Sequence, residues 1–209
     1  MSSVAQPTAS FDLTSVGHLT RCSIKLGLLE SAVVLGIGLV SRLLDGPIEV
    51  ALQAILLVAG LVAVTGLPGL WTRARTIEGI AGAAGIGLAA AWVFLVLDVA
   101  LFQPLGLYTH RWRDLGGGSN WWYHPVWWMV GTYLPWFGAW ILANQAAKHG
   151  APSLPALALA SLGLAAAVGF GAVLLHFPGA GWTLPTFGVA FLPGLALATI
   201  LSGMGVREQ

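Results

Sequence analysis

Four side chains have the chemistry of metal ligands or proton carriers: Asp98, His110, His124 and His176. Carboxylate and imidazole groups suit zinc, copper or non-haem iron, which take about three or four donors at about 2.0 to 2.2 Å. No two of the four stand three or four residues apart, so no single helix pairs two ligands. A metal site therefore needs separate elements to converge. The alternative is that the histidines only hydrogen-bond lipid headgroups or backbone carbonyls.

Asp98 is the acid in the most apolar surroundings, because Leu95 to Leu97 precede it and Val99 to Phe102 follow it. A charged side chain at the centre of a membrane helix costs about 2.5 to 3.5 kcal/mol. No basic residue is adjacent, so we expect either a partner from another helix or a neutral carboxyl group. A ligand, a proton acceptor and a structural hydrogen-bonding group are all consistent with this position.

A second candidate site is aromatic. The segment from 108 to 140 holds seven of the ten tryptophans, which is typical of an aromatic belt at a membrane surface. Trp136 and Trp140 are four residues apart, with Tyr133 nearby, and they lie too far into the expected span for a belt. Such a stripe could bind a flat cofactor such as a haem, a quinone or a pigment. It could equally pack against a neighbouring subunit.

Glu30 is the other acid within an apolar run. The expected first span begins at residue 26, so Glu30 should lie about one turn from the membrane surface. There Lys25, or extension of the side chain towards water, would neutralise it. We therefore expect a paired interfacial acid, with a proton relay as the alternative.

The elements that position these residues follow from composition. Hydrophobic residues make up 57% of the 209, charged residues only 8%, and the mean hydropathy is +0.83. Soluble domains carry about 25% charged residues, so lipid is the expected environment. The net charge of +1 gives no basic field for nucleic acid. A single cysteine, Cys22, excludes an internal disulfide.

Six stretches are long and apolar enough to cross a bilayer, which predicts an all-α bundle of about six transmembrane helices. The first run carries Glu30 and lacks a small-residue cleavage site, so we expect a retained helix. The predicted domain plan is a polar tail over 1–22, a helical domain over 23–205 and a short tail over 206–209. The predicted spans are 26–44, 48–70, 79–103, 125–145, 155–177 and 183–204.

The distribution of basic residues predicts orientation. With both termini in the cytoplasm, six of the nine Lys and Arg residues lie inside and three lie outside, as the positive-inside rule requires. Asp98 and the three histidines then share the outer side. The expected localisation is the cell membrane.

Three functions fit these features. The first is a non-catalytic subunit of a larger membrane complex, such as an electron-transfer or other energy-transducing assembly, with other membrane subunits and the bilayer as partners. The second is a metal- or haem-dependent membrane oxidoreductase that uses the outer Asp and His residues. The third is a small-molecule transporter, for which proline-broken helices are the support. The hydrolase elbow, zincin and Walker motifs are absent, which leaves the question of an enzyme open.

Overall fold

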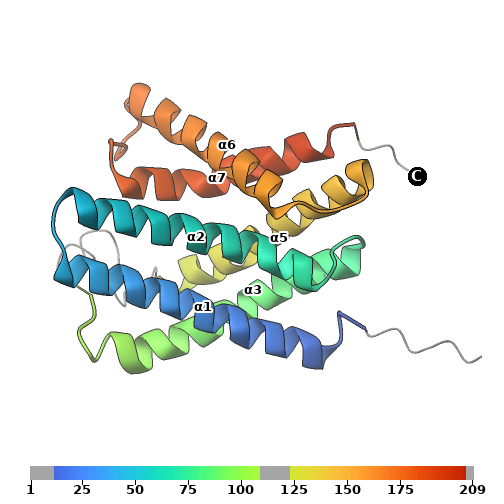
Figure 1. Ribbon diagram of the computed structural model, residues 1–209, viewed down its shortest axis with the longest axis horizontal. Coiled ribbons are helices and arrows are strands. Elements are labelled where there is room, and N and C mark those ends of the chain that lie inside the picture. The colour runs from blue at the N-terminus through green and yellow to red at the C-terminus, as the bar shows by residue number, and fades with distance from the viewer. Residues whose placement is uncertain (1–11, 109–122, 206–209) are drawn as a thin grey trace, which may run out of the picture.

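The computed structural model describes residues 12–108 and 123–205, and these residues form an all-α bundle (Figure 1). Five of its helices are long and apolar enough to cross a membrane: α1, α2, α3 with its extension η1, α6 and α7. This confirms the predicted fold class. The helices are α1 (Val16–Leu43), α2 (Pro47–Trp71), α3 (Ile77–Leu97), the π-helical turn η1 (Asp98–Phe102), α5 (Tyr123–His149), α6 (Leu154–Leu174) and α7 (Leu184–Gly203).

The boundaries of the predicted spans agree with these helices to within four residues, except at the start of α1, which lies ten residues before the predicted boundary and inside the predicted tail. A turn fixes this start, because the Asp12 carboxylate accepts hydrogen bonds from the Thr14 hydroxyl at 2.6 Å and the Thr14 amide at 2.8 Å. These bonds lower the pKa of Asp12. The predicted boundary was based on hydropathy, which marks where a helix becomes apolar. It therefore did not include the polar residues at the start of α1.

Successive helices run in opposite directions, and α1 begins on the same side of the bundle as α7 ends (Figure 1). We call this the terminal side and the other the distal side. Two contacts hold the terminal side together. The His18 ring lies 3.2 Å from the Trp71 carbonyl oxygen, and Lys148 donates to the Met204 carbonyl at 2.5 Å.

Close helix crossings depend on residues without a side chain. A Cβ atom on Gly87 of α3 would collide with the backbone of Gly131 in α5, and one on Gly138 of α5 would collide with the backbone of Thr65 in α2. Helices in lipid gain little from the hydrophobic effect between them, so such backbone approach supplies the packing energy. The centre of the bundle is α5, which packs on α2, α3 and α7.

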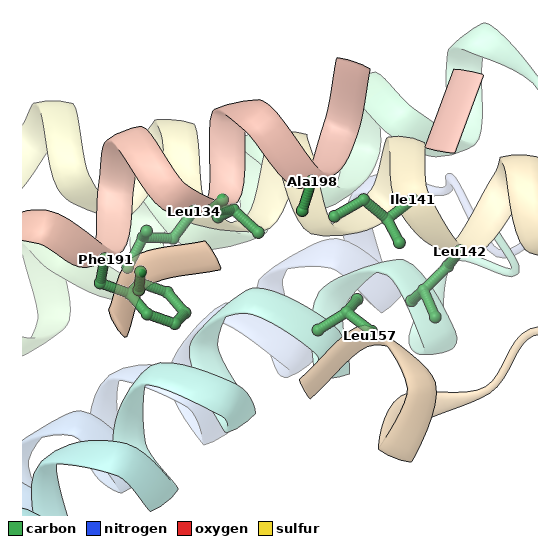
Figure 2. Packing of buried hydrophobic residues seen from close by; sticks show 8 residues of the cluster. Leu134, Ile141, Leu142, Leu157, Phe191 and Ala198 are labelled. Atoms are coloured by element: carbon green, nitrogen blue, oxygen red, sulfur yellow. The ribbon is translucent and has the colours of Figure 1, made fainter. Parts of the chain in front are cut away.

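The largest apolar cluster joins α5 to the last two helices (Figure 2). Its members are almost fully buried, and side chains from three helices interlock there. This packing fixes which face of α5 points inward and therefore which face points outward. The labelled residues are Leu134, Ile141 and Leu142 of α5, Leu157 of α6, and Phe191 and Ala198 of α7.

Candidate functional site

Asp98 is fully buried at the first position of η1. The side-chain amide of Gln103 donates a hydrogen bond of 2.6 Å to Oδ2 of Asp98, and the Tyr108 hydroxyl donates to Oδ1 of the same carboxyl group. We expected either a partner from another helix or a neutral carboxyl group, and these two donors come from the same stretch of chain as Asp98. The π-helical turn is the reason. The backbone N–H of Gln103 donates to the backbone carbonyl oxygen of Asp98, five residues back, at 2.9 Å, and the chain then folds back on itself.

The segment after η1 is anchored by an apolar cluster that includes Val34 of α1 and Phe94 of α3 together with Phe102 and Tyr108. Trp127 of α5 packs against the same cluster, with its ring 4.3 Å from that of Phe94. Three helices therefore meet beside the Asp98 turn. A role for Asp98 in holding this junction follows directly from its bonds.

The predicted metal ligands lie partly within the described residues. Asp98, His124 and His176 are all on the distal side, with His124 half-buried at the start of α5 and His176 exposed after α6. Within 12–108 and 123–205, no three His, Cys, Asp or Glu residues are placed to hold a metal ion. His110 lies outside the described residues, so the four-ligand site stays a prediction.

The aromatic residues of α5 form an outward-facing row. Tyr133, Trp136 and Trp140, here called the α5 aromatic stripe, are 40%, 37% and 37% exposed. Met129, 53% exposed, continues the row. The Trp136 ring stacks on Phe137 with centroids 5.5 Å apart and planes 15° apart, and it lies tilted by 39° against Tyr133 with centroids 5.9 Å apart. The structure places these three residues on a partly exposed face of α5, and their role as a cofactor or packing surface stays a prediction.

The depth of the stripe separates it from an aromatic belt. Trp136 lies 13 residues from Tyr123 and 13 residues from His149, about 20 Å from either end of α5 at about 1.5 Å per residue. A belt residue sits at the headgroup level instead. No hydrogen bond joins the stripe to any other described residue. The two indole rings and the phenol are therefore partly exposed, near the middle of α5.

Glu30 differs most from its predicted position. It lies 14 residues after Val16 and 13 before Leu43, at the centre of α1, and it is 6% exposed. Its Oε2 atom has no hydrogen-bond partner within the described residues. Within the described residues no ion pair joins Glu30 to Lys25, and the Glu30 side chain is buried among the helices and does not extend towards water. Thr65 and Ser161 also have buried hydroxyls without a described partner.

Known proteins add no functional evidence to this geometry. No protein-family model, no curated protein and no solved structure matches the chain significantly.

Proposed function

We propose that this chain is a non-catalytic integral-membrane subunit of a larger membrane complex, and that the α5 aromatic stripe is its contact with a neighbouring subunit. The observation that carries the proposal is the outward exposure of Trp136 at the centre of α5. The stripe residues lie on one helical face at spacings of three and four, as expected for packing against another helix.

The hydrogen-bonding capacity of the stripe supports a protein neighbour. Each indole N–H needs an acceptor, and lipid tails offer none at mid-membrane depth. Leaving such a group unpaired in an apolar medium costs about 1 to 3 kcal/mol. A partner helix can supply an acceptor and cover the rings, which removes that cost.

A flat cofactor is compatible with the same contact. A haem, a quinone or a pigment could stack on Tyr133, Trp136 and Trp140 where this chain meets its neighbour, as in an electron-transfer assembly. The stripe is a surface and not an enclosed pocket, so the second wall would come from the partner. In this proposal the chain packs against its neighbour and forms one wall of a cofactor site at their interface.

The proposed location is the cell membrane, with both termini in the cytoplasm. Within the described residues, Arg21, Lys25, Arg73, Arg75 and Lys148 lie on the terminal side, and only Arg42 lies on the distal side. Basic residues concentrate on the cytoplasmic side of membrane proteins, which supports this orientation.

Gentle detergent extraction tests the proposal. The tagged chain should migrate in native gels as part of a complex much larger than 21.7 kDa. Replacing Trp136 and Trp140 by Leu should release the free chain, because it removes both indoles while leaving α5 apolar. The matched control is Leu159→Ala on α6, whose side chain is 78% exposed, and it should leave the complex intact. A wild-type chain that migrates alone would contradict the proposal.

A further inference from the structure

A cavity opens on the terminal side of the bundle, between the ends of α2 and α5. Its volume is about 210 Å³. The end of α2, the turn that follows it, and the end of α5 line it, together with Pro152. Leu142 and Ala146 form an apolar wall, while Arg73 and Arg75 bring two positive charges. The cavity is therefore apolar on one side and cationic on the other.

The two arginines are available to a ligand. Both are exposed, and no ion pair or hydrogen bond joins either guanidinium group to another described residue. The backbone carbonyl groups at the end of α2 do not require the arginine side chains as hydrogen-bond donors, because backbone amides already bond two of them. The Thr72 amide bonds the Pro68 oxygen at 3.0 Å, and the Ala74 amide bonds the Gly69 oxygen at 2.9 Å.

The turn between α2 and α3 contains a residue in an unfavourable backbone conformation. Arg73 has φ of 45°, in the left-handed region that favours glycine. Ala74 is buried beneath the turn, which leaves Arg73 and Arg75 on the exposed side at the cavity. A strained residue at the mouth of a cavity suggests a functional reason for keeping arginine there.

We propose that this cavity binds the phosphate group of an anionic phospholipid headgroup. The planar guanidinium fork matches phosphate oxygens, and charge-assisted bonds of this kind are strong. The cavity lies at the end of α2, a helix long and apolar enough to cross a membrane, and in a bilayer the end of such a helix would lie near the headgroups. Basic pockets between helices on the cytoplasmic side recognise such headgroups. The wall formed by Leu142 and Ala146 suits the glycerol and upper acyl carbons, which a free phosphate ion lacks.

Native mass spectrometry of the purified full chain, titrated with phosphatidylglycerol, tests this site. Replacing Arg73 and Arg75 by Gln should weaken binding about 25-fold, since each basic residue contributes roughly a factor of five. Ala146→Phe, which fills the cavity without changing charge, should also weaken binding. The control replaces Arg21 and Lys25 by Gln; both are exposed on the same side, and the charge change is the same. It should leave binding nearly unchanged.

Three results would overturn the proposal. The first is wild-type affinity in the Arg73 and Arg75 double variant or in Ala146→Phe. The second is an equal loss in the control, which would mean that surface charge alone attracts the lipid. The third comes from adding inorganic phosphate in lipid-free detergent. Phosphate binding at least as tight as that of phosphatidylglycerol would assign the cavity to a free anion and not to a lipid. Weaker binding of phosphate and of phosphatidylcholine with the same acyl chains supports the lipid.

Discussion

Asp98 shows how a single buried acid can be satisfied by its own segment. Because Gln103 and Tyr108 both donate to it, the carboxyl group ties the end of α3 to the turn that follows. Asp98→Leu should leave two donors unpaired at about 1 to 3 kcal/mol each, and it should lower the unfolding temperature and the yield in detergent. Thermal unfolding of the purified variants measures this.

Asp98→Asn is the matched variant. Its amide oxygen can still accept from Tyr108, and the Gln103 amide can turn so that its oxygen faces the new amide group. We therefore expect near wild-type stability. A functional role for Asp98 predicts a different pattern, in which Asn preserves the fold while bound metal or turnover is lost.

The state of the Glu30 carboxyl group can be tested chemically. Glu30 is buried, and its Oε2 atom has no hydrogen-bond partner among the described residues. Glu30→Gln keeps the shape and removes the ionisable group, so the unfolding temperature should stay level or rise. Dicyclohexylcarbodiimide reacts with protonated carboxyl groups in apolar surroundings. It should label Glu30 in the wild-type chain, as peptide mass mapping would show. A fall of more than about 4 °C in the Gln variant, equivalent to at least about 1 kcal/mol, would instead reveal a charged partner.

For single residues, the sequence alone identified the buried acids but not the groups that donate hydrogen bonds to them. The apolar neighbours of Asp98 predicted a buried group, whereas its donors depend on a π-helical turn that no residue pattern announces. The burial of Glu30 depends on which helices pack against α1, and hydropathy does not report such packing. Hydrogen-bonding geometry therefore has to come from the structure.

At the scale of the helices, the crossing points are sensitive to single methyl groups. Gly87→Ala would place its Cβ against the backbone of Gly131, so α3 and α5 would have to separate. Overpacking of this kind costs about 1 to 3 kcal/mol. We expect a lower unfolding temperature for this variant in detergent.

Gly85→Ala is its control on the same helix, because nothing lies within 4 Å of the added Cβ. Alanine is the better helix former by about 0.5 to 1 kcal/mol, so this variant should be level with the wild type or more stable. Equal losses in the two variants would mean that α3 and α5 do not cross at Gly87.

The helices themselves were largely predictable. A bilayer demands about 20 apolar residues for each span, and this length rule located all six helices in order. The exposed face of α5 was also visible in the spacing of Tyr133, Trp136 and Trp140. The inward faces were not, because they depend on which glycines of neighbouring helices meet.

For the whole molecule, the alternation of the helices predicts a definite topology. Reporters fused after Gly46 and Gly179 should read as external, and those after Arg75 and Gly150 as cytoplasmic. The positive-inside rule gives this orientation, since five of the six described basic residues lie on the terminal side. Accessibility labelling in intact cells measures it, and the reverse pattern would move the arginine-lined cavity to the outer leaflet.

The subunit proposal depends on what covers the α5 aromatic stripe in the native membrane. A photoreactive phenylalanine analogue at Trp136, activated in intact membranes, captures whatever lies against that position. The control position is Ile55 of α2, which is apolar and 63% exposed. We predict a discrete crosslink to a different membrane protein from position 136 and only lipid adducts from position 55. Lipid adducts alone from position 136, or a crosslink to a second copy of this chain, would contradict the proposal.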